Sequence, residues 1–164
     1  MSRWRTRLWC VLLAMAAILA LFGIGDIVGG VTVDPGIALA IVGLSPGEIE
    51  AQSASAYRMW DYATRSAGVT LAIVGILMMA IVAIPYRAGA RWAWWLMWVL
   101  PVWAIAVPVM YLAFGTAPDQ PPAPPMISGP ILAAIAALIL IADRARFLDQ
   151  ASSTAEQAWG SSHG

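Results

Sequence analysis

Four long apolar stretches, separated by short polar segments, dominate the chain. The intervals without a charged residue run from Leu8 to Gly25, Ser66 to Tyr86, Trp92 to Pro118 and Gln120 to Ala142. A hydrocarbon core about 30 Å thick requires roughly 20 apolar residues of helix to cross it. The pattern therefore predicts an all-α fold, a four-helix transmembrane bundle with spans at about 8–28, 66–86, 92–115 and 126–143. Residues 1–148 form one domain in this interpretation.

The segment between the first two spans contains its own helix signals. Asp34-Pro35 is typical of a helix start and Gly43 of a helix end. Ser45-Pro46-Gly47-Glu48 then has the pattern of a capping box. No helix breaker follows until Gly68, so we expect one helix from Pro46 to Pro85, about 60 Å long. It either projects from the membrane or bends at its surface.

Prolines and small residues shape the remaining spans. Pro101 and Pro108 predict a bent third span, and the proline-rich loop 118–125 is expected to be extended. Ser128 is the predicted cap of the fourth helix. Small residues four positions apart mark expected helix contacts, namely Gly25 and Gly29, Gly68 and Ala72, and Gly129 and Ala133.

Arginines predict the orientation of the bundle. Seven of them lie on one side of the predicted spans, namely Arg3, Arg5, Arg7, Arg87, Arg91, Arg144 and Arg146. Only two, Arg58 and Arg65, lie on the other. Positive residues accumulate in cytoplasmic loops. We therefore predict a multi-pass protein of the plasma (inner) membrane with both termini in the cytoplasm. Its extension between helices 1 and 2 is then extracytoplasmic, and residues 149–164, rich in Ser, Gly, Gln and Ala, are a disordered cytoplasmic tail.

Composition narrows the classes of function. The chain is 61% hydrophobic and 11% charged with a net charge of zero, so no nucleic-acid partner is predicted. The single cysteine, Cys10, excludes an intramolecular disulfide, and the single histidine, His163, lies in the tail. No intramembrane histidine is present to ligate haem. No cofactor, metal site or catalytic residue is predicted, and the absence of a reactive motif argues against an enzyme.

Charged residues at the outer ends of the first two spans form the first candidate site: Asp26, Arg58, Asp61 and Arg65. Arg58, Asp61 and Arg65 are spaced i, i+3, i+7 and share one helix face, where Asp61 can pair with either arginine. Asp26 lies within the first span, where a charge requires a partner. We expect Arg65 to be that partner. The pair is interpreted either as a structural ion pair or as a headgroup, anion or proton site.

Tryptophans form the second candidate site, an interfacial aromatic cluster of Trp92, Trp95, Trp98 and Trp103. The first three, together with Trp94, lie close to Arg87 and Arg91, as expected for an aromatic belt at the headgroups. A quinone or porphyrin pocket is the alternative. Trp103 lies deeper in the third span, where it either packs against neighbours or lines a lipid or quinone cleft opened by the proline bends.

Three features together resemble a family. These are Arg65-Ser66-Ala67-Gly68 at the outer end of the second span, the turn Pro85-Tyr86-Arg87-Ala88-Gly89-Ala90-Arg91-Trp92-Ala93-Trp94-Trp95, and a proline-bearing third span. Over residues 1–148 the chain resembles DoxX-like small four-helix bacterial membrane proteins. The resemblance implies a four-helix bundle, and some family members are membrane subunits of quinone-linked oxidoreductases.

Two classes of function follow from these observations. The first is a non-enzymatic accessory subunit, which presents its outer helix (Glu48 to Arg65) and its apolar surface to a partner or a lipid. The second is a small oligomeric transporter or a lipid- or quinone-handling protein that uses Asp26 and Arg65. The expected partners are the lipid bilayer and either another membrane protein or further copies of this chain.

Overall fold

The computed structural model describes residues 8–115, 117 and 119–148, and all regular secondary structure within them is helical. Its elements are α1 (Leu8–Gly29), η2 (Gly30–Thr32), α2 (Pro35–Val42), α3 (Pro46–Gln52), α4 (Ala54–Ile81), η3 (Val82–Tyr86), α5 (Arg91–Leu96), α6 (Val99–Phe114) and α7 (Pro124–Leu148). The predicted all-α four-helix bundle is confirmed. The predicted tail lies outside the described residues, as do Arg3, Arg5 and Arg7.

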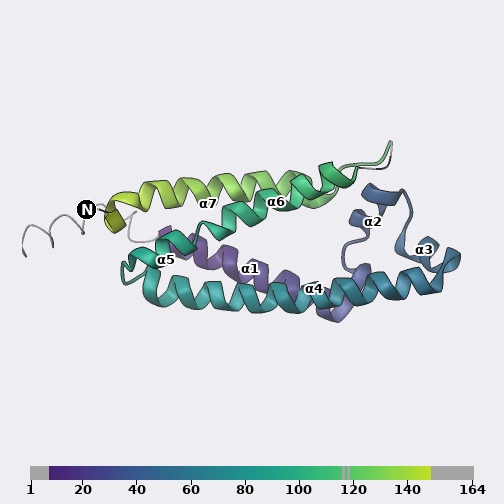
Figure 1. Ribbon diagram of the computed structural model, residues 1–164, viewed down its shortest axis with the longest axis horizontal. Helices are drawn as coiled ribbons and strands as arrows, with labels where there is room; N and C mark the ends of the chain where they lie inside the picture. Colours follow the sequence, from purple (N-terminus) through teal and green to yellow (C-terminus); the bar gives the residue numbers. More distant parts are fainter. Residues whose placement is uncertain (1–7, 116, 118, 149–164) are drawn as a thin grey trace, which may run out of the picture.

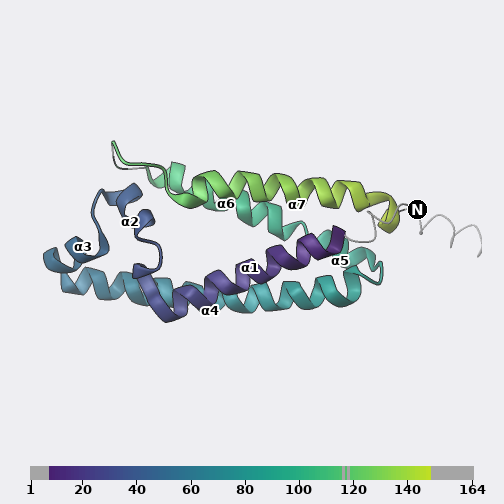
Figure 2. The same ribbon diagram turned by 180° about the vertical axis from the view of Figure 1, so that it is seen from behind.

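The helices form two pairs, α1 with α4 and α6 with α7, which lie side by side in both views (Figures 1 and 2). Small residues allow the close approach within each pair. A Cβ atom at Gly75 of α4 would lie only 2.5 Å from the backbone nitrogen of Ala20 in α1. A Cβ atom at Gly129 of α7 would lie 2.6 Å from the carbonyl oxygen of Ala104 in α6. Such close backbone contact replaces the side-chain interlocking of larger residues.

Two of the three expected small-residue pairs lie at these contacts. Gly68 and Ala72 both face Gly23 of α1, and Gly129 faces α6. The third pair, Gly25 and Gly29, does not contact α4 in this way; both glycines lie closest to Val33, just after η2. The glycine of α1 that meets α4 is instead Gly23, because it lies on the face of α1 that also carries Leu19, Ala20 and Ala16.

The two pairs are joined at one end of the molecule, called here the η3 end, which contains η3 and α5 (Figure 1). Pro85 lies within η3, and because it has no N–H group the α-helical hydrogen-bond ladder cannot continue through it. The chain adopts a wider π-helical turn, in which the Arg87 nitrogen donates to the Val82 carbonyl at 3.2 Å. The largest buried side chains lie around this turn, among them Tyr86, Met97 and Leu140.

The opposite end, called here the α2 end, contains α2 and α3 (Figure 2). The expected start and stop of α2 are confirmed: Asp34 is its N-cap, and Gly43 ends it with a left-handed φ of 73°. The capping box of α3 is also confirmed, since the Ser45 nitrogen donates to the Glu48 carboxylate at 2.7 Å. This bond and that of the Ser45 hydroxyl hold the pKa of Glu48 below its usual value.

The expected continuous helix from Pro46 to Pro85 was wrong. α3 ends at Gln52, and Ser53 adopts an extended conformation with φ −156° and ψ 96°. Its hydroxyl accepts a hydrogen bond from the Ala56 nitrogen at 3.3 Å and so caps α4. Serine competes with the helical backbone through such side-chain bonds, which makes a break here inexpensive. The outer segment is thus divided at Ser53 into α3 and the first turns of α4.

The third span has a break where a bend was expected, whereas the expected cap of the fourth helix needs correction. The third span is divided into α5 and α6 at Met97–Trp98. The cause is Pro101, which has no N–H to donate to the Met97 carbonyl and whose ring would clash with that carbonyl. Pro108, in contrast, lies inside the continuous α6. The fourth helix begins at Pro124, and Ser128 does not cap it. The Ser128 hydroxyl donates to the Pro124 carbonyl at 3.0 Å from within α7.

All four long helical segments are apolar enough and long enough to cross a bilayer: Leu8–Thr32, Ala54–Tyr86, Arg91–Phe114 and Pro124–Leu148. Large apolar side chains lie on their outer faces, for example Phe22 at 59% exposure, Leu112 at 69% and Leu138 at 66%. In water such a surface is unstable, whereas lipid tails solvate it without cost. The chain is therefore an integral, multi-pass membrane protein.

Candidate functional site

Arg65 and Asp61 form a connected cluster at the end of α1. The Arg65 Nε donates to the Asp61 Oδ2 at 2.8 Å, one helical turn earlier in α4. Its Nη1 donates to the carbonyl oxygens of Ile27 at 2.6 Å and Val28 at 2.9 Å. The last carbonyls of a helix have no partner within it and carry partial negative charge. Arg65 therefore caps α1 from the neighbouring helix.

Asp61 completes this cluster by binding the chain beyond α1. Its Oδ1 accepts a hydrogen bond from the Val31 nitrogen at 3.2 Å. Gly30 directly follows α1 and has a φ of +58°. A Cβ atom at Gly30 would collide with the Asp61 carboxylate. Glycine is the residue that adopts this conformation at no steric cost. The cluster thus fixes the turn at which the chain leaves the first span.

The structure does not form the expected ion pair between Asp26 and Arg65. Among the described residues the one salt bridge joins Arg65 to Asp61. Arg58 is exposed, and its Nε donates to the Ala54 carbonyl one turn earlier at 3.3 Å. The four predicted residues therefore do not form one site. Asp61 and Arg65 form a cluster, whereas Arg58 and Asp26 lie outside it. Sequence spacing allowed Asp61 to pair with either Arg58 or Arg65, and it did not reveal the carbonyl groups that accept hydrogen bonds from Arg65.

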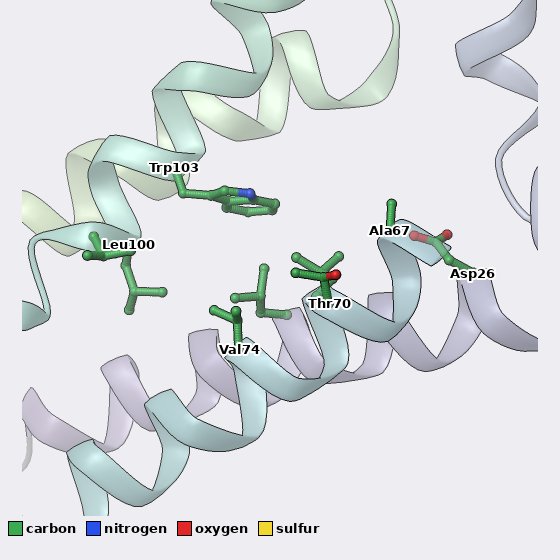
Figure 3. A pocket seen from close by; sticks show the side chains of 9 residues that line it. Asp26, Ala67, Thr70, Val74, Leu100 and Trp103 are labelled. Atoms are coloured by element: carbon green, nitrogen blue, oxygen red, sulfur yellow. The ribbon is translucent and has the colours of Figure 1, made fainter. Parts of the chain in front are cut away.

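Asp26 lines a cleft between the two helix pairs (Figure 3). The cleft has a volume of about 490 Å³ and is lined by Leu19, Asp26, Ala67, Thr70, Leu71, Val74, Val99, Leu100 and Trp103. Figure 3 shows Trp103 extending from α6 into the space opposite Thr70 and Val74 of α4. Asp26 lies at one end of the cleft beside Ala67, and Leu100 at the other.

The walls of this cleft are apolar except at the Asp26 end. The polar side-chain groups among the lining residues are the Asp26 carboxylate, the Thr70 hydroxyl and the Trp103 indole. The Thr70 hydroxyl is within 3.4 Å of the Ser66 carbonyl of its own helix. No arginine lines the cleft. The space is thus amphipathic, with a long apolar part and one acidic end.

The predicted aromatic cluster does not form one site. Trp92 and Trp95 are each 58% exposed on α5, Trp98 is partly buried, and Trp103 lies in the cleft. Of the two alternatives for Trp103, packing against neighbours or lining a cleft, its position corresponds to the second. Trp94, also expected in the belt, is instead buried at 4% exposure, and its Nε1 donates to the Leu140 carbonyl at 2.9 Å, a contact that the sequence did not reveal.

A second polar contact overlooked in the sequence lies at the η3 end. The Tyr86 hydroxyl donates to the Asp143 Oδ2 at 2.9 Å, and both side chains are buried. Asp143 is 3% exposed and is the one buried charged residue in the described part of the chain. Its position as the last residue of the predicted fourth span was the available signal, since an acid inside a span needs a partner.

Within the described residues, no group of three His, Cys, Asp or Glu side chains is placed to hold a metal ion. Comparison with protein-family models, with curated proteins and with solved structures finds no match to this chain. The fold and the site together define a multi-pass membrane protein with an amphipathic cleft between its two helix pairs.

Proposed function

We propose that this protein is a non-enzymatic lipid-binding membrane protein, which holds an amphiphile from the bilayer in the cleft between its helix pairs. The observation that carries the proposal is the composition of the cleft wall, apolar along most of its length and acidic at one end. Its volume of about 490 Å³ lies within the usual range of small-molecule sites, about 300–1,000 Å³. Such sites are mostly apolar, with a few polar groups that orient the ligand.

The arrangement of the helix pairs supports access from the bilayer. Contacts between the pairs concentrate at the η3 end, where η3, which continues α4, packs against α5, which leads into α6. The Tyr86 hydroxyl of η3 also donates to Asp143 of α7 there. Beyond that end, α6 and α7 diverge from α1 and α4 in both views (Figures 1 and 2). An acyl or isoprenoid chain can therefore enter sideways from the hydrocarbon region. Its headgroup then lies at the Asp26 end.

The orientation of the bundle belongs to the same proposal. The arginine distribution favours a cytoplasmic η3 end in the plasma membrane, with Arg87 and Arg91 at the inner headgroups. The exposed Trp92 and Trp95 fit an aromatic belt at that level. The α2 end and the acidic end of the cleft then face the outer leaflet. The resemblance to DoxX-like proteins is compatible with an accessory role beside a partner that uses the bound lipid.

A substitution that fills the cleft tests this proposal. Thr70→Trp places an indole opposite Trp103, so we expect the number of lipids retained per protein after gentle extraction to fall by about one. Native mass spectrometry with lipid extraction gives this number. Ile76→Trp is the matched control, because Ile76 lies on the same helix, is 53% exposed and does not line the cleft. Equal lipid retention in the wild type and both variants would refute the proposal.

A further inference from the structure

We infer that the cleft selects amphiphiles whose headgroup carries a protonated amine, with the Asp26 carboxylate as its contact. The inference rests on the proposed lipid-binding function and specifies the headgroup class. It is argued from the position of Asp26, from the bonding of the nearby arginine and from the sign of the surrounding charge.

Close packing of α1 on α4 fixes the position of Asp26. A Cβ atom at Gly68 would lie 2.7 Å from the Asp26 Cβ, so the α4 backbone passes directly beside the root of this side chain. The Asp26 side chain thus leaves α1 directly beside the α4 backbone at Gly68. Figure 3 shows that it extends along the cleft end, beside Ala67. Its carboxylate is thus placed at the end of the cleft, where a ligand in the cleft can reach it.

The protein supplies no cation for this carboxylate from its described residues. Arg65, the nearest candidate in the sequence, donates to Asp61 and to the Ile27 and Val28 carbonyls. The described part of the chain contains no second salt bridge. Since a charged side chain inside a membrane protein is normally paired, the missing partner of Asp26 is assigned to a ligand.

The surrounding charge favours a cationic headgroup over an anionic one. Asp26 is the one charged residue among those that line the cleft. Its carboxylate repels a phosphate or glycerol-phosphate group that approaches without a compensating amine. It attracts an ammonium group.

An ammonium group with N–H donors suits this site better than a quaternary one. A primary ammonium offers three donors to carboxylate oxygens. A quaternary ammonium has none and is usually recognised by several aromatic faces together. The cleft is lined by a single aromatic residue, Trp103. We therefore expect ethanolamine phospholipids to bind in preference to choline phospholipids, and both in preference to glycerol phospholipids.

Competitive binding of three lipids tests the inference. The full-length protein is reconstituted with equimolar phosphatidylethanolamine, phosphatidylcholine and phosphatidylglycerol that carry identical acyl chains. Lipids retained on the protein are then quantified by native mass spectrometry. The wild type is expected to enrich phosphatidylethanolamine about tenfold over phosphatidylglycerol, as one charge-assisted hydrogen bond would give. Equal retention, or enrichment of phosphatidylglycerol, would overturn the inference.

Variants separate headgroup selection from lipid binding itself. Asp26→Asn should abolish the enrichment while the total number of retained lipids stays unchanged. Asp26→Glu keeps the charge and should keep the preference. Glu50→Gln, an exposed acid on α3 away from the cleft, is the matched control and should behave as the wild type. Unchanged enrichment in Asp26→Asn would overturn the inference about the headgroup. Failure of the lipid-binding proposal itself has a different sign, because Thr70→Trp would then retain as much lipid as the wild type.

Discussion

At the scale of single residues, the end of α1 shows how a membrane helix satisfies its last carbonyl groups. Arg65 donates to two of them, Ile27 and Val28, and the Thr32 hydroxyl donates to a third, at Gly29, at 2.7 Å. Each of these carbonyls lacks a partner within α1. An unsatisfied carbonyl is costly where water is scarce. The Arg65 guanidinium can donate to Asp61 and to the two carbonyls at the same time, because its N–H groups are held in a fixed planar arrangement.

Replacement of Arg65 tests this capping role. Arg65→Gln removes three charge-assisted hydrogen bonds, so we expect the free energy of unfolding to fall by about 1–3 kcal/mol. Arg65→Lys should recover only part of it, because an ammonium cannot reproduce the fork. Unfolding in mixed detergent micelles measures the change. Arg58→Gln, on the exposed part of the same helix, is expected to change stability by no more than about 0.5 kcal/mol; equal effects of the two glutamine variants would contradict the assignment.

At the scale of elements, the η3 end is the joint that holds the two helix pairs together. Tyr86 of η3 donates to Asp143 of α7, and Trp94 of α5 donates to the Leu140 carbonyl of α7. The Tyr86 and Phe147 rings lie 4.9 Å apart between their centroids, and Arg87 lies 5.0 Å from the Trp9 ring of α1. Aromatic packing and directed hydrogen bonds thus link α1, α4 and α7 through a turn that Pro85 imposes.

Removal of one hydroxyl tests the importance of this joint. Tyr86→Phe preserves the ring but leaves the buried Asp143 carboxylate without its tyrosine donor. We expect the free energy of unfolding to fall by about 1–3 kcal/mol, the cost of an unsatisfied buried group. The unfolding midpoint in mixed micelles measures it. Tyr62→Phe removes the same hydroxyl from a side chain that is 71% exposed on α4 and should have little effect. Similar losses in both variants would show that the joint does not depend on this bond.

At the scale of the whole molecule, the cleft results from helix pairs that are joined at one end only. Within each pair, glycines bring the backbones together, and between the pairs the large side chains gather at the η3 end. Toward the α2 end, the Ala117 nitrogen donates to the Ala40 carbonyl of α2 at 2.8 Å, so α2 connects to the chain that follows α6. The space between these two connections is the cleft.

The proposed orientation is tested by single cysteines. In a Cys10→Ala background, Glu50→Cys on α3 should react with a membrane-impermeant maleimide in right-side-out vesicles. Ala88→Cys in the turn after η3 should react only after the membrane is opened. Both residues are exposed, so detergent-solubilised protein provides the control for reactivity. The reverse pattern would place the acidic end of the cleft on the cytoplasmic side and would contradict the arginine-based orientation.

Sequence alone determined the features that depend on local chemistry. Four apolar intervals gave the spans, because the length of a helix that crosses a bilayer is set by the bilayer. The limits of α2 followed from Asp34 and Gly43, and the start of α3 from the Ser45 capping box. Helical spacing likewise limited the partners of Asp61 on its own helix to Arg58 and Arg65, and the structure forms the pair with Arg65.

Only the tertiary structure decided which partners meet across helices. It directed Arg65 to the α1 carbonyls instead of Asp26, placed Trp94 in the core instead of the aromatic belt, and paired Tyr86 with Asp143. It also made the cleft, which no local pattern encodes. The rotation of each helix about its axis and the angle between the pairs arise from contacts distant in sequence. In a membrane chain, where nearly every helix face is apolar, hydrophobicity does not specify which face turns inward.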